Sequence, residues 1–369
     1  MKNILYITII VFIIISNGVF NNLNAQEKVT HWEIKTSSAL DGVCLLNTLT
    51  GDPYYLQFYT DDYNKWTDIL KSYADKNIIS IYKMKTKRGI IISSYLTYML
   101  GSNPDTTIID LKYRFENDFS SIKTQLKKSG NYNNLNWLYF RLYKKEIKGY
   151  LELLSNANFD SIYYQDIKPD IQHNIDSLAS KISGFNIVPY IENIFGEQLE
   201  SDTITIYLLN FTKPHGISIG NNRFITYYNY DIKIYINNAI HEVLHKPVNN
   251  FLSNTNYIKE LKKDTFIYNA FLNHDKNFGY NNFFAAIEES CVRFLEQAIS
   301  EKLGTSYNAK ERWKNDDKGM HVFAAILYQV YTEKPTLSFK ELIAEAVEQC
   351  KNNGGETIYN RLYYNFQNK

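Results

Sequence analysis

The chain has 369 residues and a formal net charge of +1, from 40 Lys and Arg against 39 Asp and Glu. Such a balance supplies no broad positive surface, so we expect no nucleic-acid partner. Three scattered cysteines, Cys44, Cys291 and Cys350, exclude a disulfide framework, because at most one bridge could form.

The first 25 residues have the pattern of an export signal. Met1-Lys2-Asn3 is a short positive start, Ile4–Ile15 is almost unbroken apolar sequence, and Ala25-Gln26 offers a cleavage point. An apolar core of roughly a dozen residues is short for a membrane span. We predict a signal peptide over residues 1–25 and an exported protein, periplasmic or extracellular, with no stable membrane association after cleavage. A retained membrane anchor is the alternative.

Residues 26–200 are predicted to form a mainly helical N-terminal region that follows one short strand over Val29–Lys35. Apolar residues recur at helical spacing along most of it. The segments are Ser38–Thr50, Asn64–Ala74, Ile90–Leu100, Ile108–Lys127, Leu135–Leu154 and Ile171–Ile194, the last interrupted near Gly184 and Pro189. The region shows no binding motif of its own, and we expect it to pack against the catalytic part.

Residues 201–369 are predicted to form the catalytic region. Thr203–Leu209 is rich in β-branched residues and is typical of a strand, and a second strand is expected over Phe224–Tyr228. Asp231 can cap a helix with apolar residues at helical spacing, and Pro247 is expected to end or kink that helix. The predicted fold class is therefore α+β, predominantly helical, with a small sheet.

The predicted helix carries the pentad His241-Glu242-Val243-Leu244-His245. A shorter helix entered by a strand over Ile232–Ile236 would carry it too. Residues four apart lie on one helix face, so the two imidazoles can bind one Zn²⁺ together. The intervening Glu242 can take a proton from a water activated by the metal. The spacing predicts one zinc ion per chain, with Glu242 as the catalytic base.

A catalytic zinc site needs a third protein ligand. The adjacent carboxylates Glu288 and Glu289 lie in a segment, Phe283–Ala298, whose apolar residues have helical spacing. Neighbouring residues point about a quarter-turn apart on a helix, so one carboxylate is expected at the metal and the other beside it. Cys291 is a third possibility, although a buried thiol is its simpler role.

These residues resemble the gluzincin metallopeptidases, in which an HExxH helix precedes a Glu on a later helix. A longer stretch resembles a family of secreted bacterial zincin-like proteins that is named as a domain of unknown function. The matching segments are His241–Asn249, Glu289–Arg293, Lys318–Val322, Tyr331–Pro335 and, more weakly, Asp41–Leu46. The resemblance implies a zincin-like catalytic region.

By this resemblance Glu289 is the third ligand and Arg293 its companion, with Glu288 as the alternative ligand. The chain departs from thermolysin-like proteins at Arg293, where those proteins have an acidic residue. Pro247 also comes earlier than in the family pattern. The resemblance implies peptidase machinery and names no substrate.

The expected function is hydrolysis of peptide bonds in a peptide or protein substrate. Tyr280, His274 and His321 are candidate donors to the oxyanion that forms during this reaction. The Thr203–Leu209 strand could pair with an extended peptide or be an ordinary sheet strand. Two other functions stay open: hydrolysis of a non-peptide amide, and a non-catalytic zinc-containing surface protein that binds glycans or peptides.

Overall fold

The computed structural model describes residues 29–71, 91–101, 107–128, 132–275, 278, 280 and 282–364. The predicted signal peptide lies outside these residues. The structure is 71% helical with one small four-stranded sheet, so the α+β class and the helical predominance are confirmed. None of the helices in the described ranges has the length and apolar character that crossing a bilayer requires.

The N-terminal half begins with strand β1 (His31–Lys35) and continues as helices. The helices are α2 (Ser38–Leu49), α3 (Pro53–Leu70), α5 (Ile92–Leu100), α6 (Ile108–Asn117), α7 (Phe119–Lys128), α8 (Asn134–Leu142), α9 (Lys144–Asn156), α10 (Phe159–Ile162), the π-helical turn η1 (Tyr163–Ile167), α11 (Lys168–Ile182) and α12 (Val188–Phe195). Two predicted long helices are each divided, at Asp118 and at Tyr143. The predicted break near Gly184 is present, whereas Pro189 lies within the first turn of α12.

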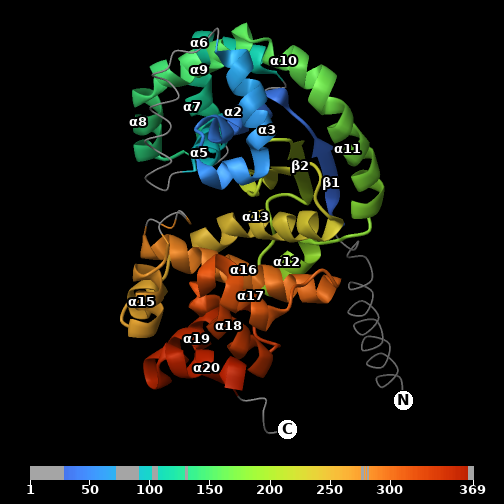
Figure 1. Cartoon of the computed structure of the whole chain (residues 1–369). Coiled ribbons are helices and arrows are strands. Elements are labelled where there is room, and N and C mark those ends of the chain that lie inside the picture. The colour runs from blue at the N-terminus through green and yellow to red at the C-terminus, as the bar shows by residue number, and fades with distance from the viewer. Residues whose placement is uncertain are drawn as a thin grey trace, which may run out of the picture.

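The C-terminal half contains the other strands and a second group of helices (Figure 1). They are β2 (Thr203–Leu209), β3 (Ile217–Gly220), β4 (Arg223–Tyr227), α13 (Ile232–Ser253), α14 (Tyr257–Leu261), α15 (Thr265–Leu272), α16 (Phe283–Leu303), α17 (Ala309–Asn315), the 3-10 turn η3 (Asp316–Gly319), α18 (Val322–Glu333), α19 (Phe339–Asn353) and α20 (Gly355–Tyr364). The two strands predicted here correspond to β2 and β4. The short strand β3 was not predicted.

The sheet has the order β1-β2-β4-β3, with β1, β2 and β4 parallel and β3 antiparallel to β4. β2 lies between β1 and β4, so the expectation that an incoming peptide could pair with Thr203–Leu209 is wrong. In the described part of the chain β3 pairs with β4 alone and forms one edge. Because β1 pairs with β2, the predicted boundary after residue 200 runs through the sheet.

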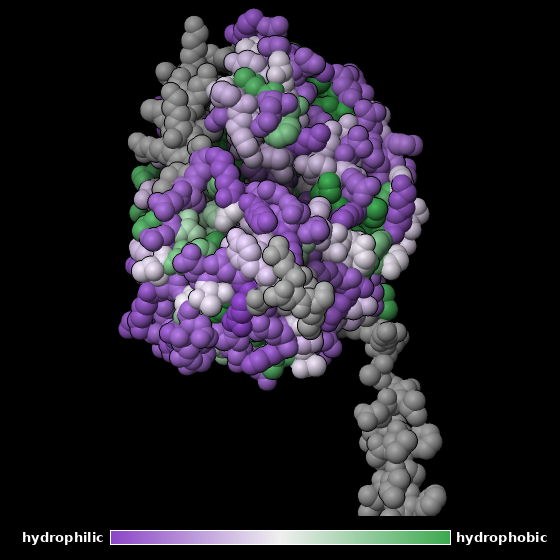
Figure 2. Space-filling view, turned by 60° about the horizontal axis from the view of Figure 1, so that its bottom comes forward, coloured by the Kyte–Doolittle hydropathy of each residue, from purple (hydrophilic) through white to green (hydrophobic). Residues whose placement is uncertain are grey.

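Helices cover both sides of the sheet, as the nearly continuous burial of β2 requires. In Figure 1 the sheet lies between α2 and α13, with α11 beside β1 and most of the C-terminal helices beyond α13. Every residue of α2 is buried. The face turned forward in Figure 2 is mainly hydrophilic, and its hydrophobic residues form small separate groups.

Helix α13 begins where predicted, with the Asp231 side chain accepting the backbone N–H of Lys233. It continues through Pro247 to Ser253, so the expectation that Pro247 ends the helix is wrong. A proline removes one backbone donor from a helix. Buried Val248 and Leu252 hold the following turns against the core and offset that loss.

Gly101 lies where α5 ends against the edge strand. A Cβ atom at this position would overlap the Thr97 carbonyl oxygen and lie 2.9 Å from Ile219 Cβ on β3. We expect Gly101→Ala to lower the free energy of unfolding by about 1–3 kcal/mol, as overpacking does. Exposed Gly184 has nothing within 4 Å, so Gly184→Ala is the control and should leave stability unchanged or higher. Equal midpoints for both variants in urea unfolding would show that Gly101 is not crowded.

Candidate metal centre

Two long helices packed along each other carry the predicted site. Helix α13 presents His241, Glu242 and His245, with its apolar face in the core. Helix α16 begins at the cap Asn282, whose side chain accepts the backbone N–H of Ala285, and it presents Glu288 and Glu289. The two glutamates are 9% and 7% exposed, so their charges need partners inside the protein.

Both imidazoles turn the same ring nitrogen toward Glu289. His241 Nε2 lies 3.6 Å from one carboxylate oxygen of Glu289, and His245 Nε2 lies 3.9 Å from the other. The opposite nitrogens are also engaged: His241 Nδ1 lies 3.0 Å from Glu296 and His245 Nδ1 lies 2.8 Å from Glu288. A carboxylate at Nδ1 favours the tautomer whose Nε2 lone pair is available to a metal.

The ligand atoms form two overlapping groups. His241, Glu242 and His245 make one and His245, Glu288 and Glu289 the other, with the atoms of each group within 4.8 Å of one another. These groups could hold a metal ion. Of the two adjacent carboxylates, Glu289 lies near both Nε2 atoms, as a third ligand would. Glu288 contacts the other ring nitrogen of His245, Nδ1.

A closed series of ion pairs surrounds the group. Arg293 Nε donates to Glu289 at 2.7 Å, and its Nη1 atom donates to Asp316 at 2.8 Å. Arg312 Nε donates to the same Asp316 at 3.1 Å, and its Nη2 atom donates to Glu296 at 2.7 Å. Glu296 contacts His241, which completes the series. Each buried charge therefore has a partner of opposite sign, which also fixes the positions of His241 and Glu289.

Asp317 is the second support of Arg293. Its carboxylate accepts from Arg293 Nη2 at 3.1 Å and from the Tyr280 hydroxyl at 3.0 Å, and it lies 2.8 Å from His321 Nε2. Asp317 and Lys318 have φ values of 46° and 57°, in the left-handed region that non-glycine residues seldom occupy. Strain of this kind collects at functional sites, and here it directs the Asp317 carboxylate toward three donors.

The predicted oxyanion donors occupy different positions. His321 is fully buried, and its second nitrogen lies 3.4 Å from the Ser290 hydroxyl, so it supports the site from inside. The Tyr280 hydroxyl donates to Asp317. His274 Nδ1 contacts the Phe271 carbonyl, and its ring centroid lies 6.1 Å from that of Tyr280. His321 thus contacts Ser290 and Asp317, and the role of an oxyanion donor stays a prediction for all three residues.

Glu242 lies beside the edge strand. A Cβ atom on Gly216 would lie 3.3 Å from Glu242 Oε1, so a larger residue here would press on the Glu242 side chain. Burial raises the pKa of the Glu242 carboxyl, although the neighbouring imidazoles and a backbone hydrogen bond from Ser218 act against this. A more basic carboxylate is a better proton acceptor.

His245 on α13 and Glu289 on α16 carry opposite charges. Burial lowers the pKa of His245, but the hydrogen bond that its ring donates to Glu288 and the charges of the nearby carboxylates outweigh it and raise the pKa to about 10. Burial raises the pKa of Glu289, but His241 and Arg293 outweigh it and hold the pKa far below its usual range. At neutral pH the His245 ring therefore carries protons on both nitrogens, and a bound cation must displace one of them. The affinity for the cation should therefore fall as the pH is lowered.

The sequence prediction missed Glu296, Arg312, Asp316 and Asp317. Glu296 could have been found, because it lies seven residues after Glu289 and hence on the same face of α16. The other three come from a separate helix and turn, and no spacing rule relates them to the pentad. No family model matches the chain, and no curated protein or solved structure matches it either.

Proposed function

We propose that this protein is a zinc-dependent metallopeptidase of the gluzincin type. The main support is the position of Glu289 near the Nε2 atoms of both histidines. A tetrahedral zinc ion with bonds of about 2.0–2.1 Å separates its ligand atoms by about 3.4 Å. The measured separations of 3.6 and 3.9 Å are close to this value. Two imidazoles and one carboxylate are also a ligand set typical of catalytic zinc.

His241, His245 and Glu289 would hold the zinc, which when bound supplies a Lewis acid that polarises a carbonyl and activates water. Glu242 accepts a proton from the attacking water and passes it to the leaving amine. Arg293 keeps Glu289 ionised and in place. Glu288 and Glu296 orient the two imidazoles through their Nδ1 atoms.

The edge strand favours a peptide over a small amide as the substrate. β3 has no strand beyond it in the described part of the chain, and it lies next to Glu242 through Gly216 and Ser218. An extended peptide could pair with this edge through its backbone, which would place a scissile bond near Glu242. A small amide lacks the extended backbone that could pair with this edge.

The test is a screen of a mixed peptide library by mass spectrometry. The mature protein should contain close to one zinc per chain by elemental analysis and should cleave peptides that the Glu242→Gln variant leaves intact. A fully zinc-loaded protein that cleaves nothing in a broad library would contradict a peptidase. Non-peptide amides would then be the next substrates to assay.

Arg312 gives a prediction about the metal site that does not require a substrate. Arg312→Met leaves the buried Glu296 without its cation, so Glu296 and His241 should shift. We expect zinc affinity to fall by about 10–100-fold. Arg312→Lys keeps the charge but loses the forked contact to Glu296 and Asp316, so an intermediate loss is expected.

Chelator competition measures these affinities, with Arg141→Met as the control because Arg141 is exposed on α8. Thermal unfolding of each variant shows whether the fold survives. A folded Arg312→Met protein with normal zinc affinity would show that the ion-pair series does not position His241.

A further inference from the structure

The loop over residues 210–216 is held by side chains from the N-terminal helices. The Asp41 carboxylate on α2 accepts the backbone N–H groups of Asn210 and Phe211 at 2.9 and 2.8 Å. The Tyr59 hydroxyl on α3 donates to the Asn210 carbonyl at 2.8 Å and accepts the backbone N–H of Lys213 at 2.7 Å. Four hydrogen bonds thus fix a loop that continues directly into β3.

The loop places His215 directly before the residue that packs against Glu242. The Tyr55 hydroxyl lies 3.1 Å from His215 Nε2, and the next residue, Gly216, packs against Glu242. Burial lowers the pKa of His215 to about 4, so its ring is uncharged at neutral pH. His215 therefore contributes a flat, neutral surface whose position does not depend on a substrate.

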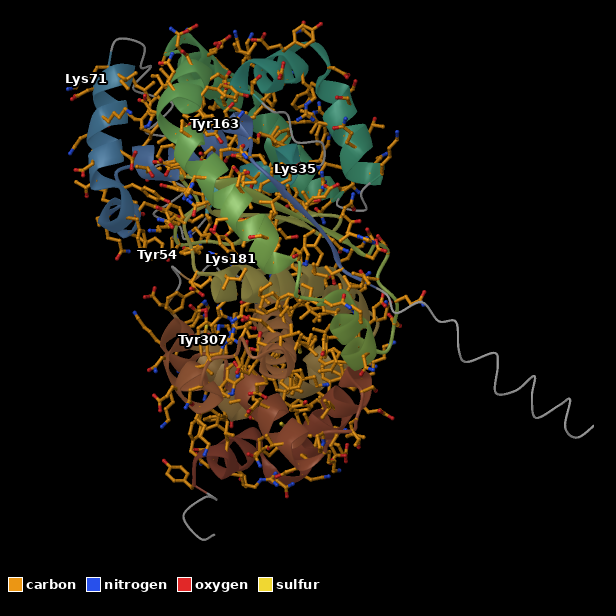
Figure 3. All side chains as sticks on the ribbon, turned by 90° about the vertical axis from the view of Figure 1, so that its right-hand side faces the viewer. Lys35, Tyr54, Lys71, Tyr163, Lys181 and Tyr307 are labelled. Atoms are coloured by element: carbon orange, nitrogen blue, oxygen red, sulfur yellow. The ribbon has the colours of Figure 1, made fainter. Side chains whose placement is uncertain are left out.

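Tyr54 lies beside the His215 ring, and about half of its own surface is exposed to solvent. Its ring centroid lies 6.1 Å from that of His215 and 6.3 Å from that of Phe58, one turn further along α3. Tyr54 is 50% exposed and Phe58 is 40% exposed. Figure 3 places Tyr54 at the end of α3 that faces the C-terminal helices, whereas Lys71 marks the opposite end.

Tyr54 is also within the electrostatic range of a residue of the metal centre. Burial raises the pKa of its hydroxyl, and the charge of the Asp317 carboxylate raises it further. Asp317 is the residue that supports Arg293 behind Glu289. The residue after His215, Gly216, lies against Glu242, so the pair of Tyr54 and His215 is joined to the catalytic glutamate through one step of the chain.

We propose that Tyr54, His215 and Phe58 form a substrate subsite that accepts an aromatic side chain of the peptide next to the scissile bond. This inference rests on the proposed peptidase function. Aromatic rings prefer partners with centroids about 4.5–7 Å apart, in tilted or edge-on orientations. Tyr54, Phe58 and His215 already have this arrangement. The rings of Tyr54 and Phe58 are partly exposed and the ring of His215 is uncharged, so they can contact a further ring without rearranging.

The experiment compares peptides that differ only in one residue, phenylalanine or alanine, at each position flanking the cleaved bond. The wild-type protein should prefer phenylalanine at one position, by about tenfold or more in kcat/KM. Tyr54→Ala should reduce that ratio several-fold, with unchanged zinc content and thermal unfolding. Tyr113→Ala is the matched control, because Tyr113 is 68% exposed on α6 and should keep the wild-type ratio.

Binding of the phenylalanine peptide to the Glu242→Gln protein, measured by calorimetry, gives a readout that needs no turnover. Adding Tyr54→Ala to that protein should weaken binding of the phenylalanine peptide several-fold relative to the alanine peptide. Cleavage without an aromatic preference, or a Tyr54→Ala protein that keeps the wild-type ratio, would overturn the subsite while leaving the peptidase intact. A zinc-loaded protein that cleaves no peptide would overturn the proposed function itself.

Discussion

Replacement of Glu242 by glutamine is expected to reduce peptide turnover by about 10²–10⁴-fold while leaving the zinc and the fold in place. Glutamine keeps the shape of the side chain beside Gly216 but removes the basic carboxylate. It cannot take a proton from water or pass one to the leaving amine. Burial raises the pKa of Glu242, which makes this carboxylate a better proton acceptor.

The measurement is kcat/KM on the best peptide from the screen, together with elemental analysis and thermal unfolding of the same preparation. Zinc content should stay near one per chain. A Glu242→Gln protein with wild-type turnover would assign the proton transfer to another group. A variant that has lost its zinc would instead show that Glu242 serves as a ligand.

The second large effect is expected at the metal itself. His241→Ala and His245→Ala should each abolish stoichiometric zinc, because each removes one of three ligands. Glu289→Gln should weaken zinc binding well beyond the roughly 10–100-fold loss expected for a supporting carboxylate, which is the loss we expect for Glu288→Gln. The reason is geometric, since Glu289 lies near both Nε2 atoms and Glu288 contacts the Nδ1 atom of His245.

Glu288→Gln is the matched control for Glu289→Gln, because the two residues are adjacent and almost equally buried. Chelator competition gives both affinities in one assay. The reverse order of effects would make Glu288 the third ligand. Equal small effects would indicate that the cation is held by the histidines and Glu242 alone.

Local signals in the sequence predicted a large part of this fold. The Asp231 cap and the apolar spacing after it identified the start of α13, and the β-branched run over Thr203–Leu209 identified β2. The four-residue strand β3 is too short to show a period, and Gly220 within it weakens the signal further. Pro247 misled the prediction because packing of the following turns outweighed a local rule.

The site divides in the same way. The histidines, Glu242 and the two candidate carboxylates lie at helical spacings that can be seen without a structure. Arg312 and Asp317 approach them from other elements, and only the packing of α16 against α17 and η3 reveals the contacts. The proposed role of Tyr54 could not be predicted from the sequence, since it depends on the placement of α3, which lies nearly two hundred residues before α13.

The pairing of β1 with β2 has a consequence for how the protein is made. His31 and Thr203 are register partners, although 172 residues separate them along the chain. During synthesis β1 leaves the ribosome early and must wait for the whole helical half before its partner appears. The sheet that supports α13 therefore cannot begin to assemble from its first strand until the chain is more than half complete, and contacts this distant slow folding. The proposed active site on α13 is therefore completed only late in the production of the chain.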